Sequence, residues 1–173
     1  MSRTSFTHDI EVVAGRYRID PDLIEALVMK ESGGHPYAFN PEPRYRWLWD
    51  VKLRKPFRQL MSSEVESTTP PSDFWSLAGD RDQEWTAQRA SWGLGQVMGA
   101  VARELGFMGP YLPEICRPEI NLQLVTEHLS NFLRRANGDY TQALAAYNAG
   151  WGGKDSPVGL AYASSVLTIV NEL

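Results

Sequence analysis

The stretch DPDLIEALVMKESGG, residues 20–34, decides the fold because it contains a complete helix with both of its ends. Asp20 offers a short side-chain acceptor for the N-cap, and Pro21 has the φ angle that the first helical turn requires. A serine and two glycines end the helix. The apolar residues between these ends recur at helical spacing, and the same spacing puts Glu31 on the apolar face. The sequence therefore predicts a helix over residues 21–31 whose core-facing side ends in a carboxylic acid.

This position favours the protonated form of Glu31. Burial desolvates the carboxylate, and the last turn of a helix carries partial negative charge, so both effects raise the carboxyl pKa. A carboxylic acid that is protonated near neutral pH is what general acid catalysis requires. The alternative is a frayed helix end from which the Glu31 carboxylate turns out into solvent. This segment alone leaves both interpretations open.

The composition indicates one domain with a substantial core. The chain has 173 residues, of which 43% are hydrophobic. A chain of this length buries about 70% of its unfolded surface, so we expect a single domain over residues 1–173. The only cysteine, Cys116, excludes an internal disulfide framework. Because the three histidines lie far apart in the sequence, we expect no metal ion, and we expect no other cofactor.

Charge and hydropathy limit the classes of partner. The formal net charge of −4 argues against nucleic acid. No run of about 18 apolar residues is present, so we expect no membrane span. The polar residues 1–9 lack the basic and apolar regions of a secretory signal peptide. We expect a monomer.

Helical periodicity predicts a mainly α fold. The expected helices cover residues 6–14, 21–31, 97–105, 120–135, 139–147 and 160–172. No segment alternates cleanly enough to predict a strand. Periodicity breaks down between residues 40 and 79, where five prolines occur, and we expect an irregular insertion there whose polar part, residues 62–72, is mobile.

Four segments stand in a characteristic order. They are ALVMKESGGHPYA (residues 26–38), ASWGLGQVM (90–98), ALAAYNAGWGG (143–153) and the tyrosine of YASSV (162–166). This ordered set resembles the soluble lytic transglycosylase family, whose members have a lysozyme-like α-helical fold and cut bacterial peptidoglycan. The resemblance covers most of the chain apart from the insertion. It implies that Glu31, followed by Ser32 in the glutamate-serine motif, is the catalytic residue.

The second segment suits contact with a sugar. Gly93 and Gly95 let the backbone approach a sugar ring closely, and the Gln96 amide offers a donor and an acceptor to hydroxyl and acetamido groups. The alternative is that Gln96 caps backbone groups at a loop-to-helix junction. The family usually has a serine nine residues before this glutamine, where Ala87 stands here, so Thr86 or Ser91 would have to supply its substrate contact.

The remaining candidates follow from the resemblance or from aromatic content. The resemblance implies that Tyr147 hydrogen-bonds the Glu31 carboxyl, that Asn148 borders the cleft and that Tyr162 lies near the active site. Without the resemblance, each tyrosine is an ordinary core aromatic. Sugar rings would stack on Trp47 or its neighbour Trp49 in the aromatic and arginine-rich start of the insertion, whose alternative role is a surface flap packed by its own aromatics.

The resemblance implies a lytic reaction on the glycan strands of peptidoglycan. A single glutamate cleaves the MurNAc-β-1,4-GlcNAc bond and leaves 1,6-anhydroMurNAc, without a cofactor. One alternative is a hydrolytic muramidase of the goose-lysozyme kind, which needs a second carboxylate, for which Glu42, Asp50 and Asp80 are candidates. The other is a non-catalytic glycan-binding or structural module.

The absence of an export signal bears on how the protein reaches its substrate. We expect action on the cell wall, reached from a virion, through holin-type release, or through a specialised secretion assembly. A phage-encoded or virion-associated member of the family fits the first two routes.

Overall fold

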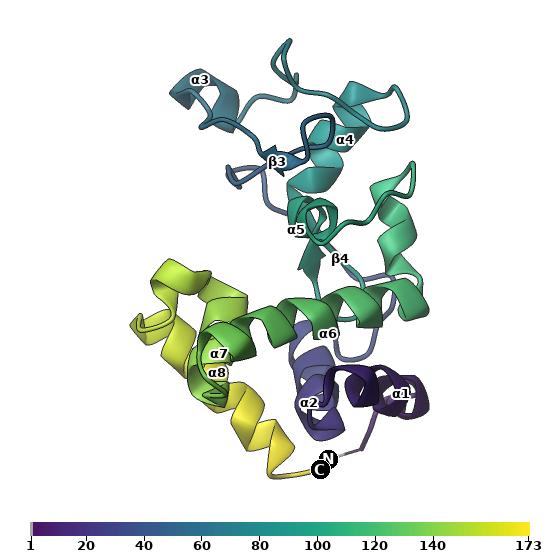
Figure 1. Cartoon of the computed structure of the whole chain (residues 1–173), viewed down its shortest axis with the longest axis vertical. Helices are drawn as coiled ribbons and strands as arrows, with labels where there is room; N and C mark the ends of the chain where they lie inside the picture. The colour runs from purple at the N-terminus through teal and green to yellow at the C-terminus, as the bar shows by residue number, and fades with distance from the viewer. Residues whose placement is uncertain (1) are drawn as a thin grey trace. The chain divides into compact units, whose positions relative to one another are not determined.

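The computed structural model describes residues 2–173, which form two compact units. The first unit contains the residues up to His35 together with Leu122–Leu173, and the second contains Pro36–Asn121. Helices make up most of the regular structure, so the predicted mainly α fold is confirmed (Figure 1). No helix within residues 2–173 is long and apolar enough to cross a membrane.

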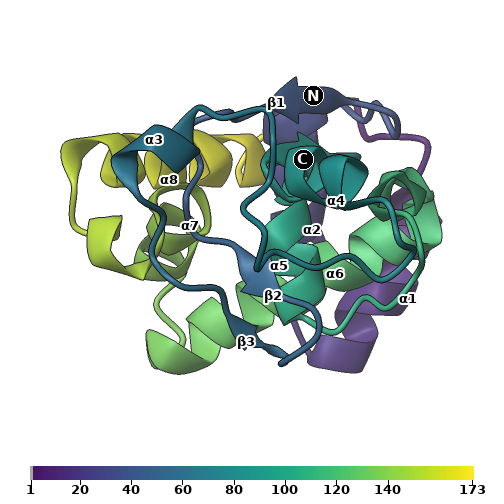
Figure 2. The same cartoon turned by 90° about the horizontal axis from the view of Figure 1, so that it is seen from above.

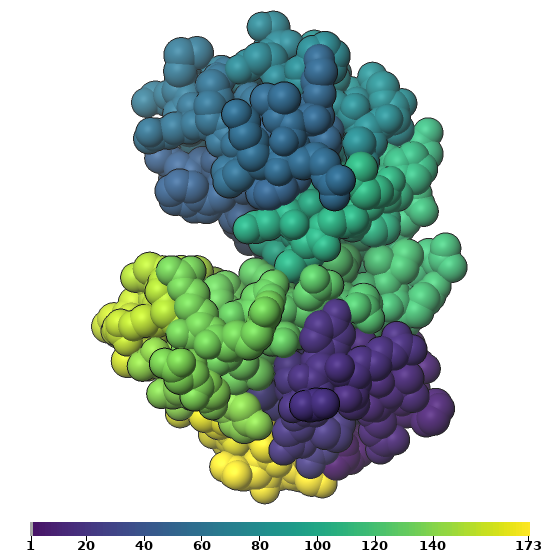
Figure 3. Space-filling view, in the orientation of Figure 1, coloured from purple at the N-terminus to yellow at the C-terminus, as the bar shows by residue number. Residues whose placement is uncertain are grey.

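The first unit is a bundle of helices. These are α1 (Thr7–Tyr17), α2 (Pro21–Ser32), most of α6 (Pro118–Arg135), α7 (Tyr140–Ala149), the 3-10 helix η2 (Trp151–Gly153) and α8 (Pro157–Val170). Helix α8 packs against α2, so both ends of the chain contribute to one bundle. On the surface of this unit, yellow C-terminal residues adjoin purple N-terminal ones (Figure 3). Helices α7 and α8 lie side by side (Figure 2). They approach closely because their contact is made of small residues: a Cβ on Gly159 would come 3.3 Å from the Cβ and from the carbonyl oxygen of Ala145 on α7.

Helix α2 has the ends that the sequence predicts. The Asp20 side chain accepts a hydrogen bond of 3.0 Å from the Asp22 backbone N–H, and Pro21 opens the first turn. Gly33 ends the helix with φ of +62°, one residue later than predicted. The apolar side chains between them are almost completely buried.

Helix α1 ends at a different place from the one predicted. It continues through Gly15 to Tyr17, and the left-handed position that ends it is Arg18, with φ of +56°. A glycine inside a helix lowers its stability without stopping it. The helix expected from residue 160 likewise begins earlier, at Pro157, because the Ser156 side chain accepts a hydrogen bond from the Gly159 N–H and caps it.

The second unit contains short strands that the sequence analysis did not predict. Strands β1 (Phe39–Pro41), β4 (Ala90–Trp92) and β5 (Val97–Met98) form an antiparallel sheet in the order β1-β4-β5, and β2 (Trp49–Asp50) pairs with β3 (Lys55–Pro56). The helices of this unit are α3 (Ser62–Val65), α4 (Arg81–Gln88), α5 (Gly99–Glu104) and the 3-10 helix η1 (Leu112–Cys116). Strands of two or three residues are too short for alternation to appear in the sequence.

Helix α5 starts later than the predicted residue 97, because Val97 and Met98 pair with β4 instead. Gly99 then opens the helix against the preceding chain. A Cβ there would lie 2.1 Å from the carbonyl oxygen of Ala87, so no other residue fits without a backbone shift.

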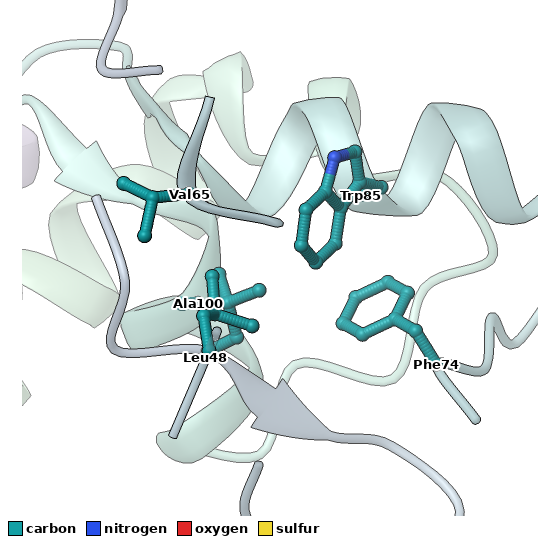
Figure 4. Packing of buried hydrophobic residues seen from close by; sticks show 6 residues of the cluster. Leu48, Val65, Phe74, Trp85 and Ala100 are labelled. Carbon is teal, nitrogen blue, oxygen red and sulfur yellow. The ribbon is translucent and has the colours of Figure 1, made fainter. Parts of the chain in front are cut away.

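The insertion contains more regular structure than predicted, and it supplies four of the six residues of a hydrophobic core cluster. The cluster consists of Leu48, Leu60, Val65, Phe74, Trp85 and Ala100 (Figure 4). The polar run 62–72 contains α3 and also contributes a polar contact, since the Ser67 carbonyl accepts a hydrogen bond of 2.8 Å from the Trp85 indole. The insertion thus covers the indole of Trp85 with both apolar and polar partners.

A buried ion pair joins α4 to α5. Glu84 and Arg103 form two hydrogen bonds of 2.9 and 2.8 Å, with side-chain exposures of 3% and 1%. Arg103 also donates to the carbonyl oxygens of Phe107 and Gly109, and Gln88 donates to Glu84. Every charged atom of this network therefore has a partner, which is the condition under which buried charge is tolerated.

Candidate active site

Glu31 lies in the last turn of α2 and points toward α8. Its carboxylate accepts a hydrogen bond from the hydroxyl of Tyr162. Burial raises the pKa of the Glu31 carboxyl, while the Tyr162 hydrogen bond and the charge of Lys30 act in the opposite direction. The alternative of a carboxylate turned out into solvent is not what the structure shows, and the raised pKa that the sequence predicts has burial as its main cause.

Two tyrosines surround this carboxyl group. Tyr162, on α8, is 9% exposed, and burial raises its pKa above the usual value, as does the charge of Glu31. Tyr147 comes from α7, and the same two effects raise its pKa. Both phenols therefore stay protonated at neutral pH and can donate hydrogen bonds to a carboxylate.

The wall behind Tyr147 is aromatic and uncharged. The His128 ring lies 5.2 Å from the Tyr147 ring and 4.6 Å from that of Phe132. Burial lowers the pKa of His128 to about 4, so its imidazole is neutral at pH 7. Sequence reasoning considered His128 only as a metal ligand and missed this packing role, because nothing in the spacing links residue 128 to residue 147.

Two further candidates directly follow Glu31 and Tyr147 in the sequence. Ser32 braces the end of α2: its hydroxyl donates to the Val28 carbonyl and accepts from the Gly34 N–H, each at 3.2 Å. Asn148 is exposed on α7, next to Tyr147. These two hydrogen bonds give Ser32 a structural role at the end of α2.

The Gly-Leu-x-Gln loop lies in the second unit and is pinned by Asn121. This buried side chain donates to the carbonyls of Trp92 and Ile115 and accepts from the Gly95 N–H, all at 2.9 Å. Gly93 has φ of +73°, and a Cβ on it would come 2.4 Å from the Asn121 amide nitrogen. The close approach that requires glycine at this position is thus to Asn121, a residue that sequence reasoning missed.

Replacing Gly93 by alanine is expected to lower the free energy of unfolding by about 3 kcal/mol, since left-handed strain and a steric clash add together. Urea denaturation measures this. Gly106→Ala is the matched control, because Gly106 has φ of +94° with no atom within 4 Å of its Cβ position. It should lose only about 1 kcal/mol. Equal losses in the two variants would show that Asn121 does not constrain the loop.

The Gln96 side chain is engaged within its own loop. Its amide nitrogen donates to the Gly93 carbonyl at 3.0 Å, and its amide oxygen accepts from the Ser91 hydroxyl at 2.9 Å. The capping role that the sequence left as an alternative is therefore present. An amide has a second N–H and a second lone pair, so Gln96 keeps one donor and one acceptor for a ligand.

The candidates for the missing family serine differ in position. Ser91 is 6% exposed and is occupied with Gln96. Thr86 lies on the exposed side of α4, and Ala87 is buried. Ser91 thus acts on the loop through Gln96, whereas Thr86 faces solvent.

Trp47 is the most exposed tryptophan of the insertion, at 72%. With Trp49 it lines a pocket of about 460 Å³ in the second unit. The alternative of a flap packed by its own aromatics holds for Phe57, which packs against the core, but not for Trp47.

The proposed second carboxylates all have structural partners. Asp50 accepts hydrogen bonds of 2.9 Å from the backbone N–H groups of Lys52 and Leu53. Asp80 caps α4, and Glu42 accepts from the Asn40 side chain. Within residues 2–173, no group of three or more His, Cys, Asp or Glu residues is arranged to hold a metal ion.

A comparison with known families identifies the family of this chain. The family model described as the Transglycosylase SLT domain matches residues 10–167. No curated protein matches the chain. The matched range includes Glu31, the Gly-Leu-x-Gln loop and both tyrosines.

Proposed function

The chain belongs to the Transglycosylase SLT domain family, and we propose that Glu31 is the single general acid and base with which it cleaves the MurNAc-β-1,4-GlcNAc bond. Membership of this family implies lytic transglycosylase activity on peptidoglycan. The observation that carries the assignment to Glu31 is a partly buried carboxyl group with a raised pKa and a phenol donor. Those are the properties of a group that gives up a proton and then takes one back.

The reaction balances with one carboxyl group. Protonated Glu31 gives its proton to the glycosidic oxygen as the bond to MurNAc C1 breaks, and the N-acetyl carbonyl stabilises the positive charge that develops at C1. The Glu31 carboxylate then removes the proton of the C6 hydroxyl, whose oxygen bonds to C1. The products are a GlcNAc end and a 1,6-anhydroMurNAc end, and no water is consumed. Attack within one sugar gains the effective-concentration advantage that a free water lacks.

Tyr162 has a defined part in this cycle. Its hydroxyl stabilises the carboxylate that forms after proton transfer, and burial keeps the phenol protonated. Tyr147, whose pKa is also raised, is the second donor that we assign to this carboxylate. In the second unit, we assign Gly93, Gln96 and Ser91 to sugar contact, with Gln96 using its second N–H and its second lone pair. We also assign Thr86 to sugar contact and Trp47 to ring stacking. Ser32 supports Glu31, and Asn148 lines the approach to it.

Tyr162→Phe is expected to slow wall cleavage by about tenfold or more, because a hydrogen bond to a charged group is lost. Activity requires protonated Glu31, so the rate falls as pH rises through the carboxyl pKa. The Tyr162 hydrogen bond lowers that pKa, and its removal should therefore shift the alkaline limb to higher pH. The pH profile of kcat measures the shift, with Tyr140→Phe on the exposed start of α7 as control. If the alkaline limb of the Tyr162→Phe profile lies at the same pH as in the wild type, Tyr162 does not hydrogen-bond the group whose titration limits activity.

The proposed reaction is tested by digesting purified peptidoglycan and weighing the released muropeptides by mass spectrometry. Products lighter by one water, without new reducing ends, support the lytic mechanism. Products of full mass with reducing ends would make the protein a hydrolase that needs a second carboxylate. Absence of any product would favour a glycan-binding module.

The substrate implies that the protein acts at the cell wall. Because peptidoglycan lies outside the cytoplasmic membrane, the protein has to be delivered there. A virion, a holin-type release or a secretion assembly would each achieve this.

A further inference from the structure

The pocket beside Trp47 has an aromatic wall and two charged groups. It lies between the insertion and α5, and its volume is about 460 Å³. The rings come from Tyr45, Trp47, Trp49 and Phe57, and the charges from Arg46 and Glu104. A pocket of this size accommodates an amino-acid side chain or a small peptide.

The pocket is preformed because its floor and one wall belong to the core. Leu48 and Ala100 line it and are also members of the buried cluster. The backbone of Trp49 is held on both sides by the buried Gln88 amide, at 2.8 and 3.0 Å. Phe57 is tied to Leu48 by a backbone hydrogen bond of 2.8 Å. A ligand therefore meets rigid walls, and little ordering entropy is lost when it binds.

The two charges of the pocket are left without partners. Within residues 2–173, neither Arg46 nor Glu104 forms an ion pair or a side-chain hydrogen bond, and the two do not pair with each other. Partial desolvation by neighbouring atoms raises the pKa of the Glu104 carboxyl, although the residue is exposed to solvent. Burial and the charge of Glu104 raise the pKa of Tyr45 to about 12, so the neighbouring phenol stays neutral. A carboxylate and a guanidinium thus face one aromatic pocket, each able to receive an opposite charge.

We propose that this pocket binds the zwitterionic end of a diamino-acid side chain in the stem peptide of peptidoglycan. Glu104 pairs with the ammonium group, Arg46 pairs with the carboxylate, and the aromatic rings cover the methylene chain. The inference rests on the proposed function, since that function makes peptidoglycan the substrate. It gives the insertion a specific role, which is to select strands by their peptide chemistry.

The test measures binding of free peptides by calorimetry, without any sugar or cleavage. The probe is the tripeptide L-alanyl-γ-D-glutamyl-meso-diaminopimelate, and the comparison probe has L-lysine as its third residue, which lacks only the side-chain carboxylate. The wild-type protein should bind the first probe about tenfold more tightly than the second. Nε-acetylation of the lysine probe should abolish its binding.

Two variants assign the charges separately. Glu104→Gln should weaken both probes by about tenfold, whereas Arg46→Gln should weaken only the diaminopimelate probe and make the two affinities equal. Glu119→Gln, an exposed carboxylate at the start of α6, should change neither affinity. Circular dichroism checks the fold of each variant, which both exposed positions should preserve. Unchanged binding in Glu104→Gln, or equal loss for both probes in Arg46→Gln, would overturn the proposal.

The outcome is independent of the catalytic assignment. Glu31→Gln should bind the peptides as the wild type does. If the protein cleaves walls but Glu104→Gln binds the peptides as tightly as the wild type, this inference is wrong and the proposed function stands. If Glu104→Gln weakens peptide binding but the wild-type protein does not cleave walls, the pocket assignment stands and the proposed function is wrong.

Discussion

Replacing Glu31 by glutamine is expected to reduce release of muropeptides by at least about a thousandfold, because in the proposed mechanism one group supplies both proton transfers. The amide keeps the shape of the side chain and can still accept a hydrogen bond from Tyr162, so only the transferable proton is lost. The measurement is the initial rate of release from purified walls. Glu11→Gln, on the exposed side of α1 in the same unit, is the matched control and should retain full activity.

The stability of Glu31→Gln separates catalysis from folding. Burial disfavours the charged form of Glu31, so removal of the charge should leave the melting temperature unchanged or raise it at neutral pH. An inactive variant with an intact melting transition would support the catalytic role. Wall lysis at the wild-type rate would show that the catalytic residue lies elsewhere.

Replacing Glu84 by alanine is expected to lower the free energy of unfolding by about 3–5 kcal/mol, the largest loss of stability predicted for this chain. The substitution leaves the Arg103 guanidinium buried with two carbonyl partners and no counter-charge. Urea denaturation followed by tryptophan fluorescence measures the loss, because the core of the second unit contains Trp85.

The matched control for this prediction is a solvent-exposed ion pair. Arg117 and Glu119 form a pair of 2.7 Å with side-chain exposures of 63% and 62%, so Glu119→Ala should cost less than about 1 kcal/mol. A double variant, Glu84→Met with Arg103→Met, should recover part of the stability, since no unpaired charge remains. A loss for Glu84→Ala as small as that of the control would mean that the buried network adds little.

The sequence predicted the helices of this protein because periodicity and capping are local properties. Asp20, Asp139 and the glycines after α2 and α7 mark helix ends through contacts with near neighbours. The predicted end of the first helix at residue 14 was wrong, because the helix continues through Gly15 to Tyr17. The short strands were missed because two or three residues are too few to show alternation, and β1 also pairs far along the chain, Phe39 with Trp92.

In the candidate site too, local features could be predicted from the sequence and long-range contacts could not. Helical spacing predicts that Glu31 lies on the apolar face of α2, and its raised pKa follows from burial there, whereas its catalytic role was inferred from the family resemblance. The partner that donates to it, Tyr162, is 131 residues away, and only the folded chain brings the two together. Asn121 and His128 carried no motif, so their contacts with the glycine loop and with Tyr147 could not be predicted.

The shared core beneath the insertion means that this segment cannot be trimmed as a loop. Residues 40–79 supply Leu48, Phe74 and the Ser67 carbonyl to the completely buried Trp85, which itself lies outside them. A shortened chain would present a bare indole and an unpaired ring N–H to water, together with the apolar face of Ala100. A shortened variant would therefore also need polar residues in place of the apolar ones that become exposed on α4 and α5. Without these substitutions the shortened protein would self-associate.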